Sequence, residues 1–252
     1  YWEYFHRAIA KFIGLFFLIP LIFFYFSKKI KKNYINVCSL IFLLILLQGV
    51  VGWYMVKSGL VNNVTVSHYR LSIHLSIGIL IISMIFWTWI NFIEKKNKIF
   101  FRLSKNNFSF LLLIIIIFLQ IILGAFVSGL DAGKIYQTWP TMGGSYLPND
   151  LNLENLNNLI ELDNHSLVQF YHRNLAYFLF FYVFFISFNI IKNKITNLYR
   201  PLKILIFITI LQVILGIFTL LSGLNLYLAS AHQITGVLLV FSAINLYYFS
   251  TK

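Results

Sequence analysis

Four of the six histidines in this 252-residue chain stand at matched positions of an internal repeat. His6 and His172 are each followed by an arginine, and His74 has its counterpart in His232. A neutral imidazole offers one nitrogen lone pair, which makes histidine the commonest metal ligand among side chains. A lone histidine in an apolar segment is often only a hydrogen-bonding partner of a neighbouring helix. Four at repeated positions indicate instead two sites with two imidazoles each.

A second repeated pattern accompanies the histidines. Gln-x-x-x-Gly, followed by Ser-Gly-Leu, occurs three times, at 48–60, 120–130 and 212–224. The glutamines are interpreted as polar residues that hold helices together, and the glycines as positions where two helices approach closely. The two halves of the chain are therefore expected to be structurally alike.

The elements that carry these residues are long apolar segments. The chain is 60% hydrophobic and 11% charged, whereas a soluble domain has roughly 25% charged residues. This composition excludes a soluble, disordered or coiled-coil protein. Seven stretches reach the length of about 20 residues that a membrane-spanning helix needs: 7–27, 34–56, 69–93, 108–130, 167–191, 202–223 and 226–249. The predicted fold class is an all-α polytopic membrane protein.

The charge distribution predicts the orientation of these spans. Most lysines and arginines follow the first, third and fifth spans, and most acidic residues lie at the opposite ends. The positive-inside rule places the lysine-rich loops in the cytoplasm or the mitochondrial matrix, so the four histidines lie near the outer face. Topology and attraction to anionic lipid explain the net charge of +13. No nucleic acid partner is therefore expected.

The repeat predicts two pseudo-symmetric four-helix bundles. Because seven spans are visible, we expect eight in the full-length protein, with the first span of the first bundle missing. Residues 1–107 would form the N-terminal half-bundle, and residues 108–252 the complete C-terminal bundle. The second bundle includes an outer loop, 131–166, whose length of about 36 residues exceeds that of ordinary connections and suggests a functional segment or a lid.

Bundle geometry suggests what the histidines bind. Alternate helices of an up-and-down four-helix bundle run parallel and lie diagonally, so each bundle would aim two imidazoles at its centre from opposite corners. This is the geometry of a haem iron with two axial histidines. Zinc is a weaker alternative, because a structural zinc site needs four ligands and neither Cys38 nor an acidic cluster completes one. His68 and His165, which have no repeat partners, are interpreted as solvated interfacial histidines.

Charged residues adjoin the histidines. Three arginines could bind lipid headgroups or haem propionates, and the sequence leaves both roles open: Arg7, Arg70 and Arg173. Glu3 lies three residues before His6, where the second half has the neutral Gln169. A carboxylate in one half only favours proton handling or charge stabilisation at a single site. The alternative is an acid placed at a helix N-terminus by the helix dipole.

Taken together and in this order, the motifs resemble those of the haem A synthase family: Glu3-Tyr-Phe-His6-Arg7, Val66-Ser-His-Tyr-Arg70-Leu-Ser-Ile-His74, Gly129-Leu-Asp-Ala-Gly133 with Pro140-x-Met-Gly-Gly144, Val168-Gln-Phe-Tyr-His172-Arg173 and His232-Gln233. The resemblance covers essentially the whole chain. It implies eight spans in two pseudo-symmetric four-helix bundles, in agreement with the repeat. Some members carry a cysteine pair in the outer loops, and this chain is similar to the subgroup without that pair.

The resemblance implies an oxidoreductase that converts the C8 methyl of haem O to a formyl group by two successive hydroxylations, which gives haem A for cytochrome c oxidase. By the same resemblance, His172 and His232 would bind the iron of a haem B cofactor, with Arg173 beside it. His6 and His74 would flank the iron of the substrate haem, and Glu3 would be the acidic catalytic residue. The arginines that would accompany the substrate haem are Arg7 and Arg70.

The implied surroundings follow from the same family. The partners would be the enzyme that produces haem O, an external electron donor such as a ferredoxin, and the lipid bilayer. A homo-oligomer is possible, and the sequence does not decide the oligomeric state. The location would be the bacterial cytoplasmic membrane or the mitochondrial inner membrane. One alternative is a di-haem electron-transfer protein of cytochrome b type, which needs two equivalent sites and no Glu3. Another is a haem-free transporter, which needs a polar midplane.

Overall fold

A computed structural model describes residues 2–59, 66–101, 104, 107–150 and 160–251, and the side chains of Trp2 and Glu3 lie outside the described set. Seven long helices follow one another along the chain: α1 (Trp2–Ser27), α2 (Lys32–Gly59), α3 (His68–Ile93), α4 (Phe108–Gly129), α5 (His165–Lys192), α6 (Tyr199–Leu221) and α7 (Leu226–Ser250). Two short 3₁₀ helices lie between them: η1 (Ala132–Lys134) follows α4, and η3 (Thr196–Leu198) lies between α5 and α6.

All seven helices are long and apolar enough to cross a membrane. The described residues contain no β-strand, only one isolated bridge between Met142 and Ser145. The predicted all-helical fold with seven spans is therefore confirmed, and the chain is a multi-pass membrane protein. Several helices extend a few residues beyond the predicted apolar stretches, because backbone hydrogen bonding continues into the polar ends of a span.

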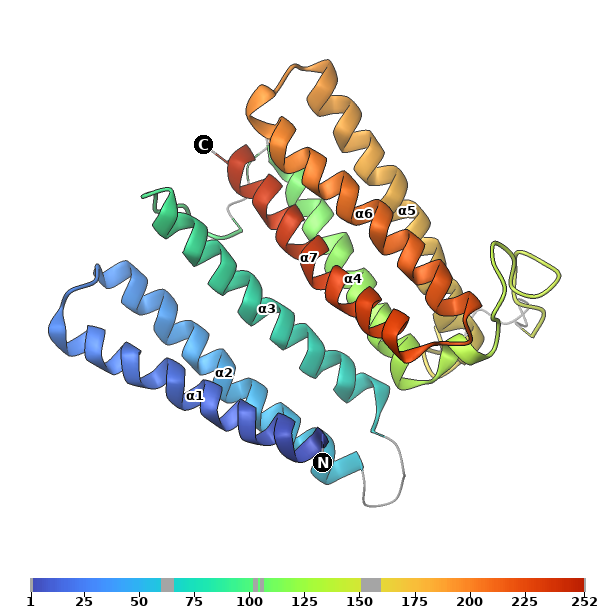
Figure 1. Ribbon diagram of the computed structural model, residues 1–252, viewed down its shortest axis with the longest axis horizontal. Helices are drawn as coiled ribbons and strands as arrows, with labels where there is room; N and C mark the ends of the chain where they lie inside the picture. The colour runs from blue at the N-terminus through green and yellow to red at the C-terminus, as the bar shows by residue number, and fades with distance from the viewer. Residues whose placement is uncertain (1, 60–65, 102–103, 105–106, 151–159, 252) are drawn as a thin grey trace. The chain divides into compact units, whose positions relative to one another are not determined.

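The chain divides into two compact units, Tyr1–Asn97 with α1 to α3 and Lys98–Lys252 with α4 to α7. In the first unit, α2 packs against both α1 and α3 (Figure 1). In the second unit, α4 packs against α5 and α7, and α6 also packs against both of them. These contacts close a ring, so the second unit is a four-helix bundle of the kind that the repeat predicts.

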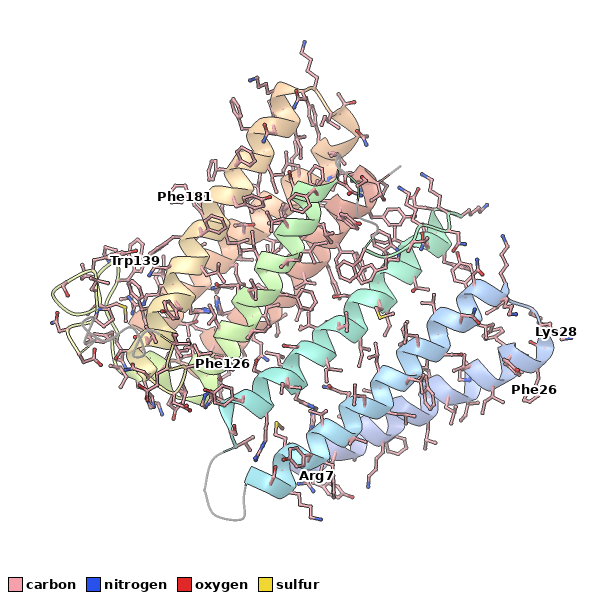
Figure 2. The ribbon with its side chains drawn as sticks, turned by 180° about the vertical axis from the view of Figure 1, so that it is seen from behind. Arg7, Phe26, Lys28, Phe126, Trp139 and Phe181 are labelled. Carbon is pink, nitrogen blue, oxygen red and sulfur yellow. The ribbon has the colours of Figure 1, made fainter. Side chains whose placement is uncertain are left out.

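The core of the second unit is made of aliphatic side chains from facing helices. Leu113 and Ile114 of α4, Leu205 of α6, and Ala243 and Ile244 of α7 are almost completely buried. Large aromatic residues point the other way, as Phe181 does on the outside of α5 (Figure 2). An apolar outer surface of this kind is what a bilayer requires of a spanning helix.

Local capping sets where the histidine-bearing helices of this unit begin. The side chain of Asn164 accepts a hydrogen bond from the backbone N–H of Leu167, 3.0 Å away, at the start of α5. Asn225 does the same for Tyr227 at the start of α7, with a distance of 3.0 Å. Asparagine caps satisfy backbone donors that a helix leaves unpaired. They therefore hold His172 and His232 within two turns of a defined helix end.

Candidate functional site

The histidines lie at one end of each unit. His6, His74, His172 and His232 stand in the first two turns of α1, α3, α5 and α7, respectively. In the first unit, Arg7 marks this end of α1 and Lys28 lies beyond the opposite end (Figure 2). In each unit, we call the end where the histidines lie the histidine end. At the other end of the second unit, Lys192 ends α5, Lys194 follows it, and Arg200 lies in the first turn of α6.

In the first unit the structure brings His6 and His74 together from two helices that are not consecutive. Their ring centroids are 6.4 Å apart, and the ring planes meet at 70°. Two bonds of about 2.0–2.1 Å, a length typical of a metal bound to an imidazole nitrogen, place the centroids of two opposed rings roughly 6 Å apart. The pair therefore has a separation that one metal ion held by two imidazoles could span.

His74 also has close neighbours on α2. The side-chain amide nitrogen of Gln48 donates to the backbone carbonyl of His74 at 3.0 Å, and it lies 3.3 Å from the ring Nε2. A Cβ added at Gly52 would lie 2.9 Å from Cε1 of His74. Because such a contact is shorter than van der Waals packing allows, only glycine leaves the ring in this place. The ring Nδ1 is buried without a hydrogen-bond partner.

His172 has the same surroundings in the second unit. The amide nitrogen of Gln120, on α4, lies 3.0 Å from the His172 carbonyl oxygen and 3.1 Å from Nδ1 of the ring. A Cβ at Gly124 would lie 3.2 Å from Cε1 of His172. The relation of Gln120 and Gly124 to the imidazole therefore repeats that of Gln48 and Gly52.

His232 has the third copy of these contacts. The amide nitrogen of Gln212, on α6, lies 3.4 Å from Nε2 of the ring, and the hydroxyl of Thr235 donates to the amide oxygen of Gln212. A Cβ at Gly216 would lie 2.9 Å from Cε1 of His232. The ring Nδ1 is buried and has no hydrogen-bond partner.

We name this arrangement the Gln–Gly–His module; its three copies are Gln48, Gly52 and His74; Gln120, Gly124 and His172; and Gln212, Gly216 and His232. Sequence reasoning interpreted the glutamines as general helix packing and so missed their contact with the histidines. A signal was available, because residues four apart lie on one face of a helix. The Gln-x-x-x-Gly spacing therefore places the amide and the gap for the ring side by side.

The arginines have different surroundings. The guanidinium of Arg70 lies over the ring of Tyr54, 5.1 Å from its centroid, in the first unit. Arg173 donates to three backbone carbonyls of the segment after α4: Tyr136 at 2.8 Å, Thr138 at 2.8 Å and Thr141 at 3.3 Å. The loop carbonyls therefore already accept hydrogen bonds from the Arg173 guanidinium, the group for which the sequence suggested lipid headgroups or propionates as partners.

Further contacts dock the same segment onto the start of α5. The amide nitrogen of Gln169 donates to the Tyr136 carbonyl at 2.9 Å, and Gln169 is 3% exposed. The hydroxyls of Tyr136 and Ser166 donate to the carboxylate of Asp150 at 2.7 and 2.6 Å. Residues 132–150 are therefore held against the helix that carries His172, at the histidine end of the second unit (Figure 1).

The hydrogen bonds of this loop affect two titrating groups. Partial burial raises the pKa of Asp150, but the bonds from Ser166 and Tyr136 outweigh burial, so its pKa lies below the usual value. Donation to Asp150 raises the pKa of the Tyr136 hydroxyl above the usual value. Both shifts follow from bonds that favour the carboxylate and the neutral phenol.

Other predicted residues are placed as follows. The side chain of Glu3, expected to act beside His6, lies outside the described residues, although its backbone belongs to α1. His165 is exposed, as expected of an interfacial histidine. His68 was expected to be solvated, and this was wrong, because it is 7% exposed and its ring lies 4.1 Å from that of Tyr69. No three histidine, cysteine or acidic residues of the described chain gather as a metal site.

Comparison with known proteins decides the family. A family model described as cytochrome oxidase assembly protein (COX15-CtaA) matches residues 1–244. A protein of Pelagibacter ubique named haem A synthase is 45% identical over 245 residues, which are 96% of this chain and 70% of that protein. The chain belongs to the haem A synthase family.

Other relatives agree with this assignment. Haem A synthase of Wolbachia pipientis from Culex pipiens is 39% identical over 238 residues, covering 94% of this chain and 70% of the relative. Haem A synthase of Flavobacterium psychrophilum is 37% identical over 245 residues, covering 95% and 71%. The resemblance predicted from the motifs is therefore confirmed, and it extends over nearly the whole chain.

The residues present suit haem. Each unit contributes two histidines at its histidine end, and the buried Nδ1 atoms of His74 and His232 lack partners. At all three modules a glycine leaves the space that the imidazole occupies. The rings of His74 and His232 are held by close packing, and each keeps one nitrogen without a hydrogen-bond partner that could bind a metal.

Proposed function

We propose that this protein is a haem A synthase, an oxidoreductase that converts haem O to haem A for the assembly of cytochrome oxidase. The observation that carries the proposal is the family match over residues 1–244, together with relatives named haem A synthase at 35–45% identity. The reaction oxidises the C8 methyl of haem O to a formyl group. Two successive hydroxylations, each using one dioxygen molecule as oxidant with two electrons from the external donor and two protons and each releasing one water, would give a geminal diol, which loses water to form the aldehyde.

The two halves predicted from the sequence take different roles in this proposal. Residues 1–107 bind the substrate haem through His6 and His74, and residues 108–252 bind a haem B cofactor through His172 and His232. The 6.4 Å separation of the His6 and His74 rings supports the first assignment. The closed four-helix bundle of α4 to α7, with a Gln–Gly–His module at each of its two histidines, supports the second. When bound, haem B supplies one-electron transfer.

The chemistry of the protein side chains follows from their positions. Glu3 lies one turn before His6 on α1 and acts as the acid or base nearest the substrate. Gln169, its repeat counterpart, is buried and donates to the Tyr136 carbonyl, so it has a structural duty instead. This difference favours a reaction in the first half of the chain. Arg7 and Arg70 contribute positive charge for the propionates of the substrate haem.

Arg173 was expected to assist the cofactor haem, and we retain it as a residue of that site. Its three bonds to loop carbonyls support a role in fixing residues 132–150 over the histidine end of the second unit. A fixed loop there would exclude water from the cofactor. An external donor such as a ferredoxin supplies electrons, and an enzyme that makes haem O supplies the substrate.

The test uses the full protein, purified from cells that supply haem O. Its haems are identified by pyridine haemochrome spectra and extraction chromatography for the wild type, Glu3→Gln and the control Glu161→Gln, an exposed acid of the loop. We expect haem B and haem A in the wild type and the control, and haem B with unreacted haem O in Glu3→Gln. Two equivalents of haem B, unchanged by Glu3→Gln, would instead indicate an electron carrier.

A further inference from the structure

The outward side of α5 is an apolar stripe. Its members follow one another at intervals of three or four residues, and each is 54–69% exposed: Phe178, Phe181, Phe185 and Phe188. Residues at this spacing share one face of a helix. In a helix that spans a bilayer, an exposed apolar face of this kind contacts lipid.

The loop after α4 extends onto this stripe. Asn174 lies one turn before Phe178, and Phe170 lies one turn before Asn174, so both continue the stripe toward the histidine end. The hydroxyl of Tyr146 donates to the side-chain oxygen of Asn174, and the Tyr146 ring lies edge-on to that of Phe170, with centroids 5.8 Å apart. Tyr146 is nevertheless 56% exposed. The loop therefore reaches the lipid-facing side of α5.

Other large apolar side chains of the loop are exposed beside Tyr146. Leu147 follows it directly and is exposed, as is Trp139. Trp139 lies on the same outward side of α5 as Phe181 (Figure 2). Tryptophan and tyrosine are enriched where a membrane meets water, because their rings are apolar and their N–H or O–H groups are polar. The exposed side of the loop thus has the composition of a membrane interface.

The polar side of the same loop faces the protein. Gln169 and Arg173, four residues apart on a neighbouring face of α5, donate to the Tyr136 carbonyl at 2.9 and 2.8 Å. The charged residues between positions 131 and 150 are Asp131, Lys134 and Asp150. This set carries no excess of positive charge that could attract anionic headgroups. Contact of the loop with lipid must therefore rest on its apolar side chains.

We propose that residues 139–147 are an anchor in the membrane interface at the histidine end of the second unit, with Trp139, Tyr146 and Leu147 among the lipids beside α5. Lipid is the occupant of this surface, because the surface is continuous with the lipid-facing stripe of the helix. The length of the loop suggested a lid, and a lid does not need aromatic side chains on the lipid side. The anchor involves no haem, so it does not depend on the proposed function.

The test uses the full chain in phosphatidylcholine vesicles and a Cys38→Ser background. A nitroxide spin label is attached to the thiol of Leu147→Cys. Electron paramagnetic resonance then measures its collision rates with oxygen, which concentrates in lipid, and with a water-soluble nickel chelate. Phe181→Cys gives the reference for a lipid-facing site, and Lys134→Cys gives the reference for an exposed, charged position of the same loop.

We expect the ratio of oxygen to nickel collisions at Leu147→Cys to be several-fold above that at Lys134→Cys and below that at Phe181→Cys. Addition of anionic lipid should leave this ratio unchanged, because the contact is apolar. The same result is expected for Trp139→Cys. This second variant decides the question if Leu147→Cys does not give a monodisperse helical protein.

Two results would overturn the proposal. A ratio equal to that of Lys134→Cys would place the loop in water. Low collision rates with both reagents would show that protein, such as a partner or a second copy of the chain, covers this surface instead of lipid. Neither result would change the proposed function, because haem content and turnover are measured separately.

Discussion

His6 and His74 face one another from α1 and α3, with ring centroids 6.4 Å apart, although 67 residues separate them in the chain. The helix between them, α2, supplies Gln48 and Gly52 to one member of the pair. A site is therefore assembled from three helices of the first unit. Each helix contributes a group whose partner is distant in sequence.

The two histidine pairs should be separable by mutation. We expect His6→Ala and His74→Ala to lose bound haem O and haem A while keeping haem B, because His172 and His232 lie in the other unit. His172→Ala and His232→Ala should lose most of the haem B. Haem extraction and chromatography of each purified variant measure this. Equal loss of every haem in all four variants would contradict the assignment of separate sites.

Gly52 should tolerate no larger residue. In Gly52→Ala the new Cβ would meet the His74 ring at 2.9 Å, and overpacking of this kind costs about 1–3 kcal/mol. We expect haem O turnover to fall by about tenfold or more. Gly49→Ala is the control, since no atom lies within 4 Å of the Cβ there. Equal turnover in the two variants would show that the close approach of Gly52 to His74 does not affect haem O turnover.

Arg173 should hold the loop to α5. Arg173→Gln removes a cation that donates to three carbonyls, and hydrogen bonds to a charged group contribute about 1.5–3 kcal/mol each when well formed. We expect residues 132–150 to be cleaved several-fold faster in limited proteolysis. Lys134→Gln is a suitable control, because its ion pair with Asp131 is exposed and local. Unchanged cleavage in Arg173→Gln would mean that Gln169 and Asp150 suffice.

Docking of the loop should depend on pH. The pKa of Asp150 is lowered in the folded protein, so its contribution is present above the usual carboxyl pKa of about 3.9 and is lost as the pH falls through the lowered value. The pKa of Tyr136 is raised, so its contribution is present below about 10 and is lost as the pH rises through the raised value. Proteolysis across this range, compared with Asp150→Asn, measures both limits.

The orientation in the membrane is also testable. In a Cys38→Ser background, the thiol of Gly144→Cys should react with an impermeant reagent added from the outer side. The thiol of Lys96→Cys should react only after the membrane is permeabilised. Both sites are exposed, and no atom lies within 4 Å of a Cβ at Gly144. The reverse pattern would contradict the positive-inside assignment.

Hydropathy, charge and repeated motifs were enough to determine the seven spans, the histidine-bearing helix ends and the family. These features depend on one segment at a time, because length and apolar composition decide whether a helix can span a bilayer. The repeat also singled out His6, His74, His172 and His232, since their matched positions are visible in the chain.

Only the tertiary structure decided which side chains meet. The contact of Gln120 with His172 joins α4 to α5, and that of Arg173 with Thr138 joins α5 to the preceding loop. The sequence could not distinguish a glutamine that only packs between helices from one that contacts an imidazole, because both need the same residue on the same helix. It likewise left the partner of Arg173 open. The rotation of one helix against its neighbour determines which side chains are in contact, and the hydropathy of the sequence does not specify that rotation.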